Sequence, residues 1–181
     1  SKGIYQGFNE GLFNSEGEYV TYLCCGDEYN SNLAVDLIGS SNATVVAASC
    51  AFIENGKETS YIRSKIKKIQ PDNMSILHGS LIVKRSAYIS INGFDENFRV
   101  SADVDAIHKI LKSGSIIYSD KIIVKQIPYG VSNQLYFTKI FEHSRILWKS
   151  NLYLGSLFYI PKRLVKDYII LVVWKMIKKW T

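Results

Sequence analysis

Two acidic residues, Asp27 and Glu28, follow directly after an apolar stretch of the chain. This stretch, residues 18–25 (EYVTYLCC), is rich in β-branched and aromatic residues and is followed by Gly26, which predicts a buried parallel strand over residues 19–23. Carboxylates beyond the carboxyl end of such a strand lie where open α/β sheets bind their ligands. Their oxygens suit a hard divalent cation that is shared with substrate phosphates. The alternative is that Gly26 and Asp27 only form a turn, in which both residue types are common.

A second pair of acids, Asp103 and Asp105, follows Ser101. Ser101 is the predicted N-cap of a helix that runs to Lys112 and stops at Gly114. This places Asp103 in the first helical turn, where the helix dipole favours its ionised form. For the same reason Asp is common in first turns without any catalytic role, so the spacing leaves both interpretations open.

The elements that must position these acids alternate between helix and strand. Apolar residues recur at helical spacing over residues 4–14, which predicts an amphipathic helix ahead of the apolar strand. Further along we expect a short helix at residues 31–38, a buried strand at 43–52 and an exposed hairpin or loop at 57–70. An apolar run within 73–88 is expected to lead into a short helix at Lys84-Arg85, followed by a turn at 92–96. The last expected elements are short strands at 116–118 and 122–127 and a long helix at 135–148. Helices that alternate with strands are typical of the α/β class.

The composition is that of a folded globular protein. The chain has 181 residues, of which 47% are hydrophobic and 21% are charged, and this predicts one domain with a substantial core. Of the three cysteines, Cys24 and Cys25 are adjacent, a pattern that fits neither a zinc site nor a disulfide framework. We therefore expect buried thiols in a reducing compartment. The first residues contain no apolar segment of the signal-peptide type.

Basic residues concentrate in the second half of the chain. Residues 1–100 carry 9 Lys and Arg against 11 Asp and Glu, whereas residues 101–181 carry 13 against 5, within a net charge of +6. In residues 151–181 basic side chains alternate with apolar and aromatic ones, which favours an amphipathic tail on a membrane surface over nucleic-acid binding. A last core helix is the alternative for this tail. Its longest apolar run, residues 168–174, is far shorter than the roughly 20 residues that span a bilayer.

Several short motifs follow one another along residues 2–132. They are Lys2-Gly3-Ile4-Tyr5 with Asn9-Glu10-Gly11, Gly17-Glu18-Tyr19-Val20 with Gly26-Asp27, His78 followed by Lys84-Arg85, Gly93-Phe94-Asp95-Glu96-Asn97-Phe98-Arg99, Ala102-Asp103-Val104-Asp105, and Tyr129-Gly130-Val131-Ser132. This series resembles that of the family 2, GT-A-type nucleotide-sugar glycosyltransferases, which build bacterial surface polysaccharides. Because the motifs keep the family's order, together they are a much stronger signal than each alone.

The resemblance implies a partial GT-A (Rossmann-like) fold. We expect an α/β domain over residues 1–150, with a mostly parallel sheet flanked by helices, followed by the basic amphipathic tail, residues 151–181. The implied reaction is inverting transfer of a sugar, of the hexosyltransferase type, from a nucleoside-diphosphate sugar to a lipid-linked or polysaccharide acceptor. The expected location is cytoplasmic, at the inner face of the cell membrane, with peripheral membrane contact and no nucleic-acid partner.

The resemblance also assigns roles to individual residues. Asp27 matches the last acid of the family's D-x-D-type motif, so it is the expected ligand of Mg²⁺ or Mn²⁺, which neutralises the leaving diphosphate. Asp103 matches the general base, which takes the proton of the acceptor hydroxyl. Contacts with the substrate are implied for the remaining matches, which are Lys2, Gly3, Asn9, His78 and Asp105.

The chain also departs from the family pattern. Ser1 stands in place of Asp, Cys24-Cys25 in place of Asn-Ser, Gly79 in place of Gln, and Tyr129 in place of Gly. The strand–helix units with which the family binds the nucleotide base have no counterpart here. We therefore expect weak nucleotide binding by this segment alone, with an N-terminal partner segment or an oligomer completing the site. The alternative function is a non-catalytic remnant that serves as a membrane-binding or protein-binding module.

Overall fold

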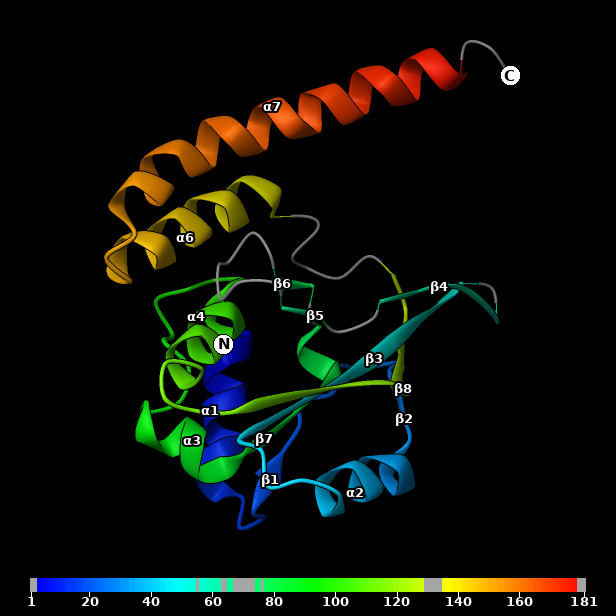
Figure 1. Ribbon diagram of the computed structural model, residues 1–181, viewed down its shortest axis with the longest axis vertical. Coiled ribbons are helices and arrows are strands. Elements are labelled where there is room, and N and C mark those ends of the chain that lie inside the picture. The colour runs from blue at the N-terminus through cyan, green and yellow to red at the C-terminus, as the bar shows by residue number, and fades with distance from the viewer. Residues whose placement is uncertain are drawn as a thin grey trace.

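The computed structural model describes residues 3–54, 56–62, 65–66, 74–75, 77–128 and 135–178. The helices are α1 (Ile4–Asn14), α2 (Ser31–Gly39), α3 (Arg85–Ser90), α4 (Ala102–Ile110), α6 (Tyr136–Lys149) and α7 (Tyr153–Lys178), with a short 3₁₀ helix, η2, at His78–Ser80. The strands are β1 (Tyr19–Val20), β2 (Glu28–Tyr29), β3 (Val45–Glu54), β4 (Lys57–Ile62), β5 (Lys65–Ile66), β6 (Met74–Ser75), β7 (Leu81–Lys84) and β8 (Ile116–Gln126). Figure 1 shows their arrangement.

Strand β3 is the centre of the main sheet. The strand order is β1-β7-β3-β8-β2, and β4 also pairs with β3. The β3–β8 pair is parallel, whereas β1–β7, β3–β7, β3–β4 and β2–β8 are antiparallel. The α/β class with flanking helices is confirmed, but the expectation of a mostly parallel sheet is wrong. An apolar run indicates that a strand is buried, but it does not indicate the direction of the strand. The tight turn at Gly56 joins β3 to β4, and so short a connection allows only an antiparallel pair.

Alternate residues of β3 contribute to the cores on the two faces of the sheet. Val45 and Ala47 pack in a cluster with side chains of α1, α3, α4 and α6, whereas Val46 and Ala48 pack with α2. All four side chains are fully buried, as the two-residue period of a strand requires. Figure 1 shows α1, α3 and α4 gathered together, apart from α2.

The apolar stretch before Asp27 is less regular than predicted. Tyr19 and Val20 pair with β7 at the edge of the sheet, and residues 21–24 form no strand. Cys24 and Cys25 are exposed, so the expectation of buried thiols is wrong for both, whereas Cys50 on β3 is buried. The β-branched and aromatic residues of this stretch indicate a fit to a half-buried surface. They do not indicate how many neighbours the strand has.

Most of the other predicted elements are confirmed to within a few residues. Asn30 caps α2, because its side chain accepts the backbone N–H of Leu33 at 3.0 Å. The two short strands expected at 116–118 and 122–127 form one strand, β8, with an irregular register against β3. Ser101 holds the predicted N-cap position of α4, but its side chain makes no capping hydrogen bond. Of the exposed hairpin at 57–70, the part from β4 to β5 is described except for residues 63–64, and the rest lies outside the described residues.

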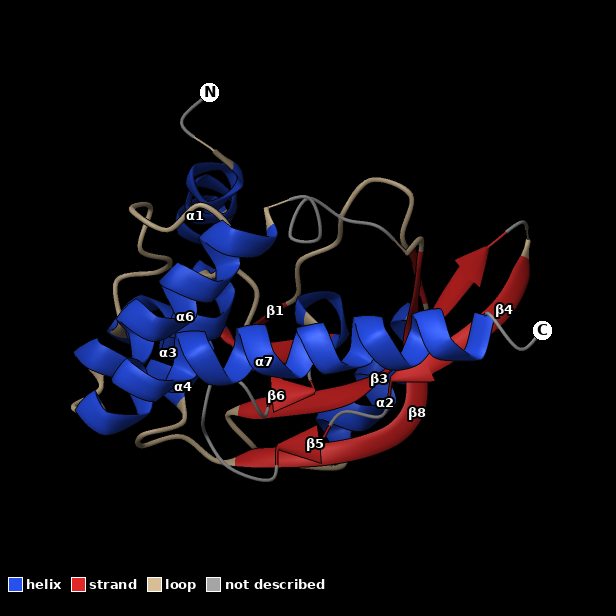
Figure 2. Cartoon of the chain, turned by 90° about the horizontal axis from the view of Figure 1, so that it is seen from above, coloured by secondary structure: helices blue, strands red, loops and turns tan. Residues whose placement is uncertain are grey.

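The last two helices pack against each other. A hydrogen bond of 2.9 Å joins His143 Nδ1 to the Tyr159 hydroxyl, and another of 2.9 Å joins the hydroxyls of Ser144 and Ser156. Helix α6 in turn packs on the domain core through Ile146, which is fully buried. The predicted tail is thus a helix whose first part rests on α6 and whose second part runs on past the end of α6 (Figures 1 and 2).

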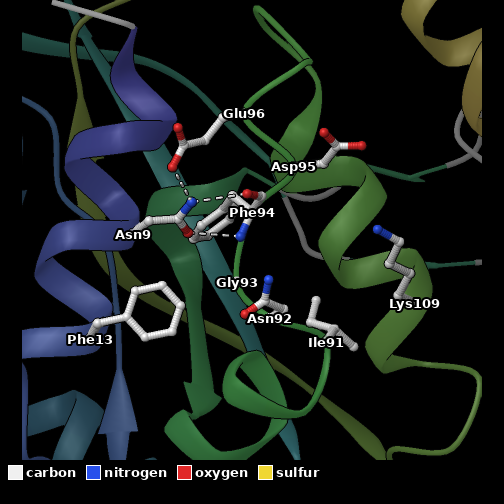
Figure 3. Close-up of a pocket in the computed structure, with 9 residues that line it drawn as sticks. All are labelled: Asn9, Phe13, Ile91, Asn92, Gly93, Phe94, Asp95, Glu96 and Lys109. Carbon is white, nitrogen blue, oxygen red and sulfur yellow. Dashed lines mark hydrogen bonds between the residues drawn. The ribbon is translucent and has the colours of Figure 1, made fainter.

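A buried amide joins α1 to the turn that precedes α4. Asn9 Nδ2 donates to Phe94 O and to Glu96 Oε1, at 2.9 Å each, and Phe94 N donates to Asn9 Oδ1 at 2.8 Å (Figure 3). Gly93 has a φ of +71°, and a Cβ at this position would lie 2.4 Å from Asn9 Oδ1. Glycine is therefore required here both for the left-handed backbone and for the close approach of the Asn9 amide.

Replacing Gly93 with Ala is expected to destabilise the domain by about 2–4 kcal/mol, because the left-handed conformation is costly for Ala and the buried Asn9 hydrogen bonds must break. The matched control is Gly11→Ala in α1, where a new Cβ meets nothing within 4 Å and Ala favours the helix by up to about 1 kcal/mol. Urea unfolding followed by circular dichroism measures both changes. Equal stabilities of the two variants would contradict the role of Gly93.

Candidate active site

Asp27 closes a tight turn beside the end of β8. Its backbone N–H donates to Cys24 O at 3.1 Å, and its Oδ2 accepts the backbone N–H of Cys24 and the side-chain amide of Gln126, at 2.9 Å each. Gln126 is the last residue of β8. The turn interpretation of the sequence is thus confirmed, and the cation-binding interpretation stays a prediction. Residues 24–27 form a turn, and the turn places Asp27 beside the carboxyl end of β8, the partner of β3 in the parallel pair, where α/β sheets bind ligands.

Asp103 lies in the first turn of α4, as predicted. The hydroxyl of Tyr5, on α1, donates to Asp103 Oδ1 at 3.1 Å. Burial raises the pKa of Tyr5 far above its ordinary value, and the charge of Asp103 raises it further. The hydroxyl therefore keeps its proton at neutral pH, and α1 holds the Asp103 carboxylate through a permanent donor.

Asp27 and Asp103 act on the same side chain. Partial loss of hydration raises the pKa of the Cys24 thiol although the residue is exposed overall, and the charges of Asp27 and Asp103 raise it further. The charges of both carboxylates therefore affect the pKa of Cys24, although Asp27 belongs to a turn and Asp103 to α4. Asp27 also contacts Cys24 directly, through the Cys24 backbone N–H, whereas Asp103 acts on it through charge alone.

A cluster of aromatic rings packs beside Asp103. It consists of Tyr5, Phe8, Tyr22, His78, Tyr88 and Phe94. His78 stacks on Tyr22 with ring centroids 5.0 Å apart, and its Nε2 lies 3.3 Å from the Tyr88 hydroxyl. Burial lowers the pKa of His78, while the charge of Asp103 acts in the opposite direction. The net lowering keeps His78 neutral at pH 7, as a packed member of this ring cluster.

The other residues expected to contact substrate lie in different surroundings. Lys2 is outside the described residues. Gly3 lines a hollow of about 410 Å³ together with Tyr5 and residues 96–99, and Asn9 lines a second hollow of about 420 Å³ (Figure 3). Asp105 is buried, and its Oδ2 lies 2.6 Å from Lys109 Nζ. The neighbouring acids of α4 thus have different partners, since Asp103 meets Tyr5 and Asp105 meets Lys109.

Glu142, on α6, is a site residue that the sequence analysis does not identify. Its buried carboxylate accepts the backbone N–H groups of Arg99 at 2.6 Å and Val100 at 3.0 Å. These donors belong to the segment directly before α4, so Glu142 fixes the approach to Asp103. An isolated acid within a helix is a visible signal, but the sequence gives no indication of which backbone groups it meets.

Lys149, also on α6, holds the same segment further upstream. Its Nζ donates to Asp95 Oδ2 at 2.8 Å, and it lies 4.9 Å from the ring centroid of Phe98. Burial alone would raise the pKa of Asp95, but hydrogen bonds from Lys149 and Asn97 outweigh burial and lower the pKa to about 2. Asp95 is therefore ionised and paired with Lys149 at neutral pH.

Asp27 offers one carboxylate oxygen to a cation. Two donors occupy Oδ2, and we find no hydrogen bond to Oδ1 from any described residue. In the described part of the chain, no three His, Cys, Asp or Glu side chains are grouped so as to hold a metal ion. One protein carboxylate nevertheless fits Mg²⁺, which is often bound by one or two carboxylates together with water and substrate phosphates. The residues present therefore fit a cation that the substrate helps to hold.

The chain is similar to sequences that are named as glycosyltransferases. The chain is 25% identical over 166 residues to an uncharacterized glycosyltransferase of Rickettsia felis, and to the same degree to one of Rickettsia conorii. Each match covers 83% of this chain and 28% of the relative, so the chain spans little more than a quarter of the length of these relatives. No protein-family model matches the chain.

Solved structures show the same fold. S. aureus TarS 1–349 superposes with a TM-score of 0.57 at 17% identity, covering 80% of this chain and 45% of that one. The same protein in complex with UDP-GlcNAc gives a TM-score of 0.58 at 16% identity, with coverages of 81% and 47%. The described sheet and helices therefore share the fold of part of TarS. The predicted resemblance to glycosyltransferases agrees with the two sequence matches.

Replacing Asp103 with Asn is expected to lower the pKa of Cys24, because it removes a negative charge near the thiol. The thiolate is the reactive form, so alkylation of Cys24 by iodoacetamide, followed by mass spectrometry, should reach its half-maximal rate at a lower pH than in the unmodified chain. A Cys25→Ser background isolates Cys24, since Cys50 is buried. Asp36→Asn, at an exposed position of α2, is the matched control. An unchanged pH profile in Asp103→Asn would show that the two groups do not share a site.

Proposed function

We propose that the chain carries the metal-binding and acceptor side of an inverting glycosyltransferase, which transfers a sugar from a nucleoside-diphosphate sugar to a lipid-linked or polysaccharide acceptor. The observation that carries the proposal is that the fold holds two carboxylates for separate roles: Gln126 holds Asp27 at the end of β8, and Tyr5 holds Asp103 at the start of α4. The reaction needs one carboxylate for a cation and another for a proton. The structures of TarS with UDP and with UDP-GlcNAc support a nucleotide-sugar donor.

Asp27 is the proposed ligand of Mg²⁺ or Mn²⁺. When bound, the cation neutralises the charge that develops on the leaving diphosphate. The backbone N–H of Cys24 and the amide of Gln126 hold Oδ2 of Asp27, so Oδ1 is the oxygen left for the cation. The turn at residues 24–27 then acts as the support of a binding group, and not merely as a connection.

Asp103 is the proposed general base. It takes the proton of the acceptor hydroxyl while the oxygen of that hydroxyl bonds to the anomeric carbon of the sugar and the bond from that carbon to the diphosphate breaks. Tyr5 donates to Oδ1 of Asp103, which leaves Oδ2 as the oxygen that receives the proton. Attack on the face opposite the leaving diphosphate inverts the configuration at the anomeric carbon.

The substrate contacts proposed for Lys2, Gly3, Asn9, His78 and Asp105 depend on the resemblance to the family. Gly3 and Asn9 support it because each lines a hollow on the surface, and Glu96 lines both hollows. His78 supports it because it lies among rings near Asp103. Asp105 is bound to Lys109, which also lines the hollow beside Asn9, so the two act there as a pair.

Asp103→Asn is expected to lower sugar transfer by about 10²-fold or more with little change in donor binding, because the amide keeps the shape of the carboxylate and loses its basicity. Asp27→Asn is expected to weaken Mn²⁺-dependent donor binding and to lower transfer with it. Transfer from radiolabelled UDP-GlcNAc to a membrane lipid extract is measured at high donor concentration, since we expect weak nucleotide binding by this segment. Asp36→Asn is again the matched control.

The outcomes of this experiment separate the competing functions. Near-normal turnover by Asp103→Asn would move the role of general base to another residue. Transfer that is insensitive to Asp27→Asn would remove the metal assignment. A chain that folds, binds no donor and transfers no sugar would favour the alternative, a non-catalytic module that binds a membrane or a protein.

We further propose that α7 lies on the cytoplasmic face of the cell membrane. Ser156 and Tyr159 are buried where α7 meets α6, whereas other large apolar side chains of this helix are exposed; these are Leu157, Phe158, Leu164, Val165, Tyr168 and Ile169. At 100° per residue these six gather within one half of the helix, and Lys162 and Lys166 border them. An apolar face bordered by basic residues suits an anionic membrane surface. Packing as a last core helix accounts only for the side of α7 that meets α6.

Membrane spanning is a different matter from surface binding. Among the described helices, none combines the length and the hydrophobicity needed to cross a bilayer.

Anionic liposomes are expected to sediment the chain, and binding should weaken as salt is added, because each basic residue near an anionic leaflet contributes about 1 kcal/mol through screened electrostatics. Changing Leu157 and Tyr168 to Ser should reduce this binding strongly. The matched control is Val35→Ser, which removes a side chain that is 66% exposed on α2, close to the 67% of Tyr168. No liposome binding by the unmodified chain, with unfolding on deletion of residues 161–181, would support the core-helix alternative instead.

A further inference from the structure

The Asp27 carboxylate is held from a neighbouring strand by Gln126. Nε2 of Gln126 donates to Oδ2 of Asp27 at 2.9 Å, across 99 positions of sequence. Gln126 ends β8 and pairs in register with Phe52 of β3, so the parallel strand pair fixes its backbone. The support of Asp27 therefore comes from the centre of the sheet as well as from its own turn.

Cys50 helps to set the orientation of the Gln126 amide. Its Sγ lies 3.5 Å from Gln126 Oε1. Burial, together with the charge of Asp27, raises the pKa of Cys50 to about 12, so the thiol is protonated at neutral pH and its S–H is available as a donor. With Oε1 facing this donor, the NH₂ end of the amide faces Asp27. The Cys50 S–H is shared between Gln126 Oε1 and the backbone carbonyl of Ala51, which lies 3.4 Å from Sγ, so Cys50 assists the orientation in which the Gln126 amide donates to the Asp27 carboxylate.

Gly79 provides the space for this amide. A Cβ at Gly79 would lie 2.8 Å from Gln126 Nε2, whereas Tyr22 O, the nearest atom of another residue, would lie 3.5 Å away, an ordinary contact. Gly79 is not among the glycines with a positive φ, so the backbone conformation itself does not demand glycine. The reason for glycine at this position is the room taken by the Gln126 side chain.

We propose that Gln126 is the positioning residue of the Asp27 carboxylate, and that Gly79 is required in order to admit the Gln126 amide beside Asp27. This inference rests on the proposed metal role of Asp27. Gln126 acts through Asp27: it holds Oδ2, in concert with the backbone N–H of Cys24, and leaves Oδ1 for the cation. The amide also satisfies an oxygen that would otherwise compete for the same cation.

The test measures Mn²⁺ binding by NMR, through the paramagnetic broadening of the backbone amide signal of Gly26. This broadening detects weak binding near Gly26 and needs no enzyme activity, and the Asp27→Asn variant assigns it to one carboxylate. Asp27→Asn should abolish it. Gln126→Ala should raise the Mn²⁺ concentration for half-maximal broadening by about tenfold, as is typical when the hydrogen-bond partner of a metal ligand is lost. Gln6→Ala, which removes a glutamine bound to Glu10 on α1, is the matched control.

Gly79→Ala separates positioning from a general loss of stability. In the presence of Gln126 the new methyl group displaces Nε2, so Mn²⁺ binding should weaken. In the Gln126→Ala background that space is empty, and Gly79→Ala should have no further effect, which makes the two changes non-additive. Gly39→Ala, where a Cβ meets nothing within 4 Å, is the matched glycine control. Melting temperatures establish that every variant is folded.

The outcomes distinguish this inference from the proposed function. Mn²⁺ broadening that is lost in Asp27→Asn but unchanged in Gln126→Ala, or additive effects of Gly79→Ala and Gln126→Ala, would overturn the positioning role and leave the metal site standing. If the unmodified chain shows no broadening, the metal role of Asp27 fails. The side-chain amide signals of Gln126 then test whether Gln126 contacts Asp27. A shift of these signals in Asp27→Asn supports the contact, and unchanged signals overturn it.

Discussion

The buried amide of Asn9 is the contact on which the geometry of the site depends. It joins α1 to the turn after Gly93, and from this turn the chain runs to Asp103 through residues 97–101, which form neither helix nor strand. Glu142 holds the far side of this segment through two backbone N–H groups. A buried polar group left without a partner costs about 1–3 kcal/mol. Side-chain hydrogen bonds therefore replace the ladder of hydrogen bonds that regular structure would provide.

Helix α1 links this framework directly to the chemistry. The same helix places Asn9 on the turn and Tyr5 on the Asp103 carboxylate, so the proposed base and the segment that carries it are fixed from one rigid element. The titratable neighbours of Asp103 are kept in their neutral forms, because burial raises the pKa of Tyr5 and Tyr88 and lowers that of His78. The rings packed around Asp103 therefore add no charge of their own beside it.

Local signals in the sequence predict the elements well and their mutual arrangement poorly. The apolar period of α1 and the apolar run of β3 each report on a few adjacent residues, and both elements are found. The strand directions, the edge position of β1 and the exposure of Cys24 and Cys25 depend on partners elsewhere in the chain, so composition cannot reveal them.

The residues of the candidate site likewise fall into two groups, those that lie in local sequence motifs and those that act through distant contacts. Asp27 and Asp103 can be found because motifs in a fixed order surround them. Glu142 and Gln126 lie outside these motifs, and they act on groups 43 and 99 positions away, respectively. Contacts of this kind become visible only when the fold brings the two ends together. The absence of a side chain at Gly79, in η2, is in this sense as informative as any motif, since the reason for it is a residue of strand β8.

Helix α6 connects the site to α7 through neighbouring residues that point in different directions. Successive side chains of a helix diverge by about 100°, so Glu142 can bind the segment before α4 while His143 binds Tyr159 of α7. With α7 on a membrane surface, as proposed, these buried polar contacts set the position of Asp103 relative to that surface. A lipid-linked acceptor presents its hydroxyl near the membrane plane, and holding the base at a defined position relative to that plane reduces the orientational cost of reaction. A freely jointed tail would bind the membrane without defining that position, so the packing of α7 on α6 favours a lipid-linked acceptor over a soluble polysaccharide.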